Sequence, residues 1–382
     1  MIYFDNSATT KVDDQVLETY NKVSQNIWGN PSSLHAWGEK AFNLLEQSRK
    51  QIADLMHCNA DEIYFTSGGS EGDNWAIKGT AMEKMPYGKH LITSSVEHPA
   101  VSNTMAHLKK MGFEVTYLPV DKEGRVSAKD LKAAIRKDTV LVSIMAINNE
   151  IGTIEPIDEL AKVLEDYPKI HFHVDAVQAI GKGIDDLLAN PRIDLMTFSG
   201  HKFHAPRGIG FMYKKRGRMI QPLIDGGGQE KALRGGTENL PAIAGMAKAL
   251  RLLLDNETEK VAMQREIKQK IYNHIVNFDK VHIFSQPTAQ FAPHILCFTI
   301  DGVRGETIVH AFEKYGIYIS TTSACSSKKG TIAGTLNAMH VPESIASSAV
   351  RISLDEHNTM AEAEEFIKVF DQLYEKFKMI NS

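Results

Sequence analysis

Short apolar runs alternate along this chain with stretches of helical periodicity, and this alternation constrains the fold more than any other feature. Helical patterns occupy, for example, residues 100–110 and 158–165. Runs of strand length occupy residues 63–65, 91–93, 113–118, 140–147, 172–174, 195–198 and 209–213. Strands that alternate with helices predict an α/β fold in which helices flank a mostly parallel sheet.

The chain is long enough for more than one domain, because its 382 residues exceed the roughly 100–200 residues of a typical domain. We expect a large domain with a mostly parallel, mixed sheet over residues 13–255. A smaller C-terminal α+β domain is expected over residues 256–382, with residues 1–12 packing on it. The stretch 239–277 carries few turn signals, and we expect one long helical segment there to bridge the two domains.

Composition and targeting signals exclude several classes of protein. The formal net charge is -4, which provides no bulk attraction to nucleic acid or to an anionic membrane. The first ten residues lack a signal-peptide pattern, and no apolar run reaches the roughly 18 residues that a membrane span needs. Three widely separated cysteines fit a reducing compartment. We therefore expect a cytoplasmic protein that binds neither a membrane nor nucleic acid directly.

Polar residues follow strand after strand at the point where each apolar run ends. In an open α/β sheet, ligands bind outside the carboxyl ends of the strands. These segments therefore outline one candidate site at a single edge of the sheet. The polar segments are 67–72, 97–99, 148–150, 175–178 and 199–202.

Two of these segments suggest anion binding and amine chemistry. The turn 67–70 is rich in serine and glycine and precedes a helical stretch, so it predicts either a phosphate cradle or an ordinary turn. It matches neither the P-loop nor the GxGxxG pattern. Lys202 follows Ser199-Gly200-His201 at the end of a strand. A lysine at the mouth of a sheet suits Schiff-base chemistry, whereas the ordinary reading is a solvated surface lysine.

Asp175 ends the strand 171–174 and has three readings. A carboxylate there can pair with a protonated pyridine nitrogen or cap the following turn. The third reading is a metal site, because His171, His173 and Asp175 begin a HxHxD pattern. Position 176 is alanine rather than the further histidine of that pattern, so we expect no metal. His98 would stack on a cofactor ring or serve as a structural histidine.

Cys325 and Arg351 lie in the C-terminal third of the chain. Cys325 belongs to a small, polar segment, and the nearby Lys328 and Lys329 favour the reactive thiolate. Cys297, in an apolar run, is better explained as a buried core thiol. Arg351 lies in a strand-like run and needs a partner, either a substrate carboxylate or an internal salt bridge.

The ordered blocks that carry these residues resemble the NifS/IscS-type cysteine desulfurases, in the class V aminotransferase fold group. The likeness runs nearly end to end and implies a fold type I transferase that depends on pyridoxal 5′-phosphate (PLP). Many blocks in one order are far more specific than any single motif. The matching blocks are 3–10, 29–33, 97–98, 148–152, 173–178, 199–202, 234–237, 323–325 and the region around Arg351.

The resemblance implies a role for each candidate residue in a reaction that converts L-cysteine to L-alanine. Lys202 would carry PLP and shuttle the α-proton, Asp175 would pair with the ring nitrogen, and Cys325 would take the sulfur as a persulfide. His98 would stack on the ring and act near it. Gln178 would hydrogen-bond the ring oxygen. The phosphate would be bound by Gly69, Ser70, Ser199 and His201, and by Thr237 from the other subunit of a homodimer. The substrate carboxylate would be held by Arg351 and by Asn149, which also lies beside the cofactor, with Asn30 nearby.

The sulfur acceptor is the least constrained part of the resemblance. It implies an acceptor protein, either a thiolation enzyme for tRNA or cofactors or an iron–sulfur scaffold. The segments 204–207 and 328–331 depart from the usual family pattern, and the chain ends soon after Phe377. These departures leave the identity of the acceptor open, and a thiolation partner is our hypothesis.

Four alternatives remain at this point. A selenocysteine lyase would use the same groups. A class V aminotransferase is disfavoured by Cys325. A metallohydrolase would rest on the HxHxD pattern, and a PLP-free binding module is disfavoured by Lys202 and Asp175.

Overall fold

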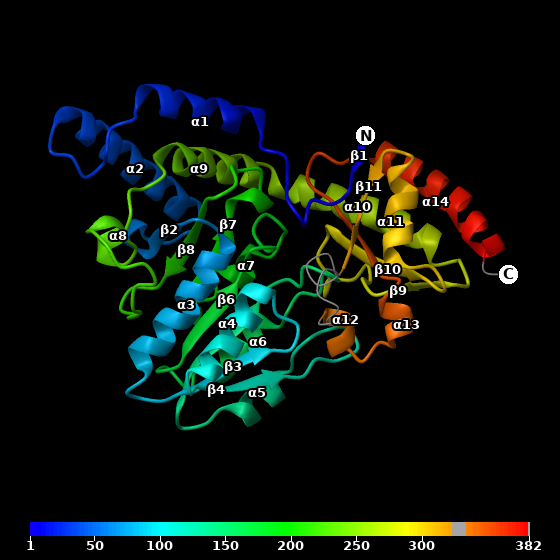
Figure 1. Ribbon diagram of the computed structural model, residues 1–382, viewed down its shortest axis with the longest axis horizontal. Helices are drawn as coiled ribbons and strands as arrows, with labels where there is room; N and C mark the ends of the chain where they lie inside the picture. The colour runs from blue at the N-terminus through cyan, green and yellow to red at the C-terminus, as the bar shows by residue number, and fades with distance from the viewer. Residues whose placement is uncertain (323–333, 381–382) are drawn as a thin grey trace.

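A seven-stranded sheet forms the centre of the larger part of the protein in a computed structural model, which describes residues 1–322 and 334–380 (Figure 1). Its strand order is β2-β8-β7-β6-β5-β3-β4. Neighbouring strands pair in parallel, except that β8 is antiparallel to both β2 and β7. The predicted mostly parallel sheet is therefore confirmed. The strands are β2 (Ile63–Thr66), β3 (His90–Ser94), β4 (Glu114–Leu118), β5 (Thr139–Met145), β6 (His171–Asp175), β7 (Leu195–Ser199) and β8 (Gly210–Lys214).

Helices cover both faces of this sheet, which explains why its central strands are continuous apolar runs rather than alternating ones. Every residue of β5 is buried, for example. The helical elements of this part are α1 (Asp14–Asn26), α2 (Ala36–Leu55), η1 (Ala60–Glu62), α3 (Gly69–Lys84), α4 (Pro99–Lys110), α5 (Ala128–Ala134), α6 (Ile157–Leu164), α7 (Asp185–Leu188), η2 (Gly200–Lys202), α8 (Gln229–Ala232) and α9 (Leu240–Leu254).

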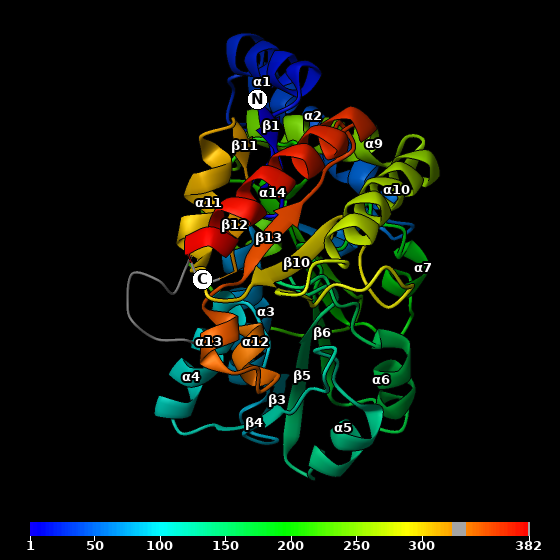
Figure 2. The same cartoon turned by 90° about the vertical axis from the view of Figure 1, so that its right-hand side faces the viewer.

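The smaller part is built on an antiparallel sheet of order β12-β13-β10-β9, across which α14 lies (Figure 2). Its sheet face and the apolar sides of α10, α11 and α14 enclose a second hydrophobic core. Its elements are α10 (Glu257–Ile275), β9 (Val281–Ile283), β10 (Ile295–Ile300), α11 (Gly305–Glu313), β11 (Ile317–Tyr318), β12 (Ser320–Thr321), α12 (Thr335–Ala338), α13 (Glu343–Ala346), β13 (Val350–Ser353) and α14 (Met360–Ile380).

The N-terminal residues pack on this smaller part. Strand β1 (Ile2–Tyr3) pairs in parallel with β11, and Phe4 is fully buried in the second core. The chain then crosses to the large sheet before α1 begins. The two separate cores support a division close to residues 255 and 256, which stays a prediction.

The prediction of one long helical segment over 239–277 is wrong, because the chain forms two helices there. Helix α9 ends at Leu254, and α10 begins at Glu257. Asn256 between them adopts a left-handed conformation with φ 56°, which asparagine tolerates better than most residues. Lys260 donates to the carbonyl oxygens of Leu252 and Leu253, at 2.6 and 3.1 Å, and so satisfies the end of α9.

None of the helices within residues 1–322 and 334–380 has the length and apolarity that a membrane crossing requires.

Candidate active site

The polar segments predicted from the sequence follow strands β2, β3, β5, β6 and β7, which all point in one direction. Their carboxyl ends therefore meet at one edge of the sheet. The chain order reverses between the neighbours β3 and β5, and such a switch point is where open α/β sheets bind ligands. His98 and Asn149 follow these two strands, so both lie at the switch point.

The start of α3 and the end of β7 come together where the sequence predicted either a phosphate cradle or an ordinary turn. A side-chain carbon at Gly69 would lie 2.8 Å from Val177 Cγ2 and 3.5 Å from Ser199 Cβ, so only glycine allows this approach. Gly68, the residue before the helix, has φ 147°. The N–H groups of the first helical turn lack intrahelical partners and favour an anion. Ser70 is exposed in the same turn and lines a hollow of about 430 Å³ together with His98.

An ion pair that sequence reasoning missed holds this turn in place. Glu71 accepts the N–H of Ser67 at 2.9 Å and pairs with Arg234, whose Nε lies 2.9 Å from Oε1. Arg234 begins the block 234–237 that the family resemblance singled out. The pair therefore connects that block to this turn.

Lys202 lies in η2 directly after β7. Its Nζ donates to the carbonyl oxygens of Ser7 and Ala8, at 2.5 and 3.0 Å. Its positive charge also acts on the titration of His98 and Asp175. The amine is therefore close to the two groups that were predicted to face a cofactor ring.

Asp175 is buried at the end of β6, where its Oδ1 accepts the N–H of Val177 at 3.0 Å. Burial raises its pKa, and His98 and Lys202 oppose that rise. Asp73 is a second buried carboxyl, and burial together with Asp175 raises the pKa of Asp73 well above its usual range. Two buried acids in one place favour a cationic partner.

His98 has a structural role at the start of α4, and its stacking on a cofactor stays a prediction. Its Nδ1 accepts the N–H of Ala100 at 3.1 Å and so caps α4. Burial lowers its pKa, Asp175 opposes this effect, and Lys202 adds to it. A neutral ring in this position suits stacking on a cofactor.

The metal alternative for the HxHxD pattern is wrong, because the ring nitrogens of its histidines form hydrogen bonds with hydroxyl groups. His173 Nδ1 lies 2.8 Å from Ser143 Oγ, and its Nε2 lies 3.0 Å from Thr197 Oγ1. His171 Nδ1 lies 3.1 Å from Thr80 Oγ1. Burial lowers the pKa of His171 to about 2 and that of His173 to about 3. Both rings are structural and neutral.

The N-terminal segment lies against the site, which strand patterns alone could not reveal. Gln178 donates to the carbonyl oxygen of Ser7 at 3.0 Å, the same oxygen that accepts from Lys202. His201 Nδ1 lies 3.2 Å from Thr9 Oγ1, and burial lowers its pKa to about 4. Residues 7–9 therefore support the cofactor-binding candidates of β6 and β7.

Arg351 lies in β13 of the smaller part and reaches back to the large sheet. It is 6% exposed, donates to the carbonyl oxygen of Asn149 at 2.6 Å and pairs with Asp5 at 3.0 Å. Its Nε is buried and has no hydrogen-bond partner within the described residues. The internal salt bridge therefore exists, and one donor of the guanidinium remains for an incoming carboxylate.

Two predicted residues are not gathered at this edge, and a third cannot be placed. Asn30 is exposed in the connection between α1 and α2, and its side chain accepts the N–H of Ser32 at 2.9 Å. Thr237 is exposed after α8. Cys325 lies outside the described residues.

The described residues on either side of the Cys325 segment are both held at the site. Ser320 of β12 pairs with Arg351 of β13. On the other side, Glu150 accepts the N–H of Thr335 at 3.0 Å, and burial raises the pKa of Glu150 to about 7. Described residues on both sides of that segment therefore lie beside the predicted carboxylate-binding residues.

Comparisons with known proteins agree over the whole chain. The aminotransferase class-V family model matches residues 2–366. A NifS/IcsS protein homolog of Lactobacillus delbrueckii subsp. bulgaricus is 63% identical over 381 residues, covering 100% of this chain and 99% of that protein. The cysteine desulfurase IscS of Methanosarcina thermophila is 41% identical over 377 residues, covering 99% of this chain and 93% of its own length.

Solved structures give the same answer. A NifS-like protein superposes with a TM-score of 0.90 at 37% identity and covers 99% of both chains. SspA in complex with cysteine superposes with a TM-score of 0.81 at 34% identity, over 94% of this chain and 100% of its own.

Proposed function

We propose that this chain, which belongs to the class-V aminotransferase family and is a cysteine desulfurase of the NifS/IscS type, binds PLP at Lys202 and accepts the sulfur of L-cysteine on Cys325. One observation carries the proposal. Lys202, Asp175 and His98 follow or end the strands β7, β6 and β3, whose carboxyl ends meet at one edge of the sheet. Ser320 and Thr335, described residues on either side of the Cys325 segment, contact Arg351 and Glu150.

The site residues fit the cofactor that the family uses. Asp175 and the second buried acid suit a protonated ring nitrogen, and the cradle at Gly69 and Ser199 suits a phosphate. Ser70 and His201 would complete the phosphate contacts, with Thr237 from a second subunit. Gln178 would face the ring oxygen and His98 the ring. When bound, PLP supplies an electron sink that stabilises negative charge at the substrate α-carbon.

The residues of the chain then divide the remaining work. Arg351 holds the substrate carboxylate with its available Nε, and Asn149, which accepts from the same guanidinium, positions that side chain. Lys202 takes the α-proton and returns a proton to the product. Backbone carbonyl oxygens accept hydrogen bonds from Lys202 and Arg351, which fixes both side chains before the substrate binds.

Cys325 provides the nucleophile. Its thiolate attacks the substrate sulfur, an S–S bond forms, and the Cβ–S bond breaks. The electron pair of the broken bond stays with the three-carbon fragment, which takes up protons and leaves as L-alanine. The enzyme retains the sulfur as a persulfide for an acceptor protein. A thiolation enzyme is the acceptor that we favour over an iron–sulfur scaffold, and the cytoplasm is the expected location.

The remaining candidates, Asn30 and Thr237, support a homodimer. Asn30 lies among exposed apolar side chains of the α1–α2 region, where Trp28 is 70% exposed and Leu34 is 104% exposed. Apolar groups gathered in this way favour contact with another protein surface. A second copy of the chain would cover this surface, so that Asn30 and Thr237 of one subunit reach the site of the other.

Borohydride reduction tests this proposal, because it fixes PLP to the lysine that carries it. We expect the PLP mass on the peptide with Lys202, and L-alanine formation from L-cysteine. Lys202→Ala should lose both, whereas Lys214→Ala should keep both. PLP on another lysine, or undiminished L-alanine from Lys202→Ala, would contradict the assignment.

A further inference from the structure

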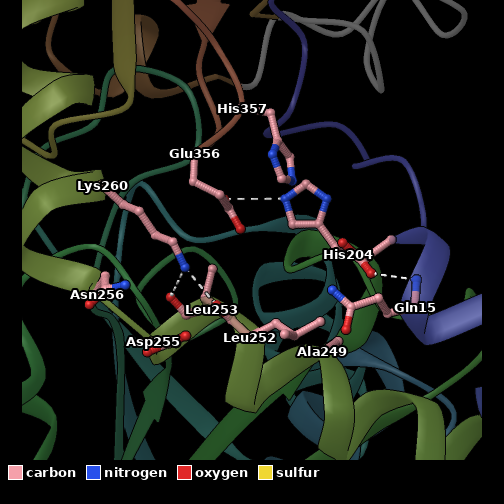
Figure 3. Close-up of a pocket in the computed structure, with 11 residues that line it drawn as sticks. Gln15, His204, Ala249, Leu252, Leu253, Asp255, Asn256, Lys260, Glu356 and His357 are labelled. Atoms are coloured by element: carbon pink, nitrogen blue, oxygen red, sulfur yellow. Dashed lines mark hydrogen bonds and ion pairs between the residues drawn. The ribbon is translucent and has the colours of Figure 1, made fainter.

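A second group of polar side chains lies away from the proposed catalytic edge, where the two parts of the protein meet. His204 follows η2 two residues after Lys202, and Glu356 and His357 lie in the connection from β13 to α14. The three side chains line a hollow of about 260 Å³ (Figure 3). Among the described residues, this is the one group of histidine, cysteine or acidic side chains with metal-binding spacing.

His204 is held in an unusual conformation by the N-terminal segment. Its φ of 63° lies in the left-handed region, which is uncommon for a residue with a side chain and often marks a functional position. Its Nδ1 lies 2.8 Å from the carbonyl oxygen of Lys11. A carbonyl oxygen only accepts, so Nδ1 carries a hydrogen and a neutral ring presents a lone pair at Nε2.

That nitrogen faces the Glu356 carboxylate, which lines the same hollow. His204 is 5% exposed, and its Nε2 is buried without a hydrogen-bond partner in the part of the chain that the structure describes. Oε2 of Glu356 lies 3.2 Å from Nε2, and Oδ2 of Asp355 lies 3.8 Å from it. Figure 3 shows the Glu356 carboxylate facing the His204 ring, with His357 beside both.

This arrangement matches the surroundings of a metal-binding histidine. Such a histidine usually donates its other ring N–H to a backbone carbonyl, which fixes its orientation. The possible ligand atoms of His204, Glu356 and His357 lie within 4.8 Å of one another. Zinc bonds of about 2.0–2.1 Å place tetrahedral ligand atoms roughly 3.4 Å apart, so a small turn of the exposed His357 side chain closes the site.

A proton is the competing occupant. Burial lowers the pKa of His204, but Glu356 and Asp355 outweigh it and raise that pKa. Burial opposes ionisation of Glu356, yet His204 lowers the pKa of Glu356 to about 2. Lys182, buried nearby, interacts with both acids. Protonation of His204 explains its contact with Glu356, but it gives no role to His357.

We propose that His204, Glu356 and His357 bind a divalent transition-metal ion of the zinc type, with water from the hollow as the fourth ligand. The ion joins the segment that carries Lys202 to the connection that follows the strand of Arg351. Its role is therefore to fix the two parts of the protein against each other. This inference does not depend on the proposed catalytic chemistry.

Calorimetric titration with ZnCl₂ tests the site on PLP-loaded protein that has been stripped with a chelator. A Cys58→Ser/Cys325→Ser background removes the two cysteines other than the buried Cys297, because thiols also bind zinc. We expect about one ion per chain, bound at least tenfold more weakly after His357→Ala or Glu356→Gln. His310→Ala is the matched control, because His310 forms an exposed pair with Glu313 at 2.9 Å.

A second measurement separates binding from misfolding. Zinc should raise the thermal midpoint of the background protein and of His310→Ala, and leave that of a folded His357→Ala unchanged. Zinc binding that survives His357→Ala, or no binding in the background protein, would overturn the proposal. Equal weakening by His310→Ala would overturn it as well.

Discussion

The carboxyl edge of the large sheet and the segments that approach it from outside differ in how their candidate residues are held. At the edge, Asp175 and His98 each have a fixed backbone partner and are largely buried. Outside it, Asn30 and Thr237 are exposed, and Cys325 lies beyond the described residues. The candidates at the edge therefore have fixed partners within the chain, whereas Asn30 and Thr237 are exposed on outlying segments.

Removal of the edge amine should have the largest effect. We expect Lys202→Ala to lower the rate of L-alanine formation at least about 1000-fold, because a positioned general base alone is worth roughly 10²–10⁴. The loss should appear in kcat. If Lys202→Ala lost less activity than Asp175→Asn, the group that contributes most to the rate would be another residue of the edge.

Substitution of the two buried acids, Asp175 and Asp73, should affect activity to different extents although both are buried. Asp175→Asn removes the charge that would face the ring nitrogen, and breaking such a buried pair costs on the order of 10²–10³-fold in activity. Its thermal midpoint should not fall, since burial already disfavours this charge. Asp73→Asn, the matched control, should stay within about tenfold of wild-type activity. Equal losses in both would contradict this difference.

Arg351 connects the edge to the smaller part, and its loss should affect substrate binding more than turnover. Lysine cannot reproduce the guanidinium fork, so Arg351→Lys should raise KM for L-cysteine roughly 10–100-fold. Steady-state kinetics check this, with the exposed Arg304→Lys as control. A change confined to kcat would argue against a role in holding the carboxylate.

The outlying α1–α2 surface should control assembly. Leu34→Glu places a charge on the exposed apolar surface and should shift the protein from dimer to monomer, with activity lower by about tenfold. Sedimentation velocity measures the shift. Met219→Glu changes another exposed side chain and should remain dimeric. A dimeric Leu34→Glu protein would remove this surface from the interface.

The smallest effect concerns Glu150, which anchors the residues after the Cys325 segment. Its pKa in the folded protein is raised to about 7 from 4.5 by burial, so the folded state holds the proton more tightly than the unfolded chain. Stability from this group is therefore present below about pH 4.5 and lost as the pH rises to about 7. Glu150→Gln should flatten this part of the thermal-midpoint profile, and the exposed Glu343→Gln should not.

The sheet and its edge could be predicted because strand order and carboxyl-end chemistry follow from local patterns. Asp175, Lys202 and Ser199 directly follow or end apolar strands, so topology alone brings them together. The break at Asn256 was missed, because a single left-handed residue leaves the helical periodicity on both sides intact.

Contacts between distant segments were beyond sequence reasoning. The carbonyl oxygen of Ser7 accepts from both Lys202 and Gln178, and no periodicity encodes that approach. The partners of the HxHxD histidines were equally hidden, since the hydroxyl of Thr197 that contacts His173 comes from another strand. The pairing of His204 with Glu356 likewise depends on how the two parts meet.

The most direct test of the account is the mass of the Cys325 peptide after the PLP-loaded enzyme has reacted with L-cysteine. The account predicts one added sulfur on that peptide and L-alanine in solution, both lost in Cys325→Ala and both retained in Cys58→Ala. L-alanine formed at an undiminished rate by Cys325→Ala, with no sulfur on the peptide of the unmodified enzyme, would contradict the thiol mechanism.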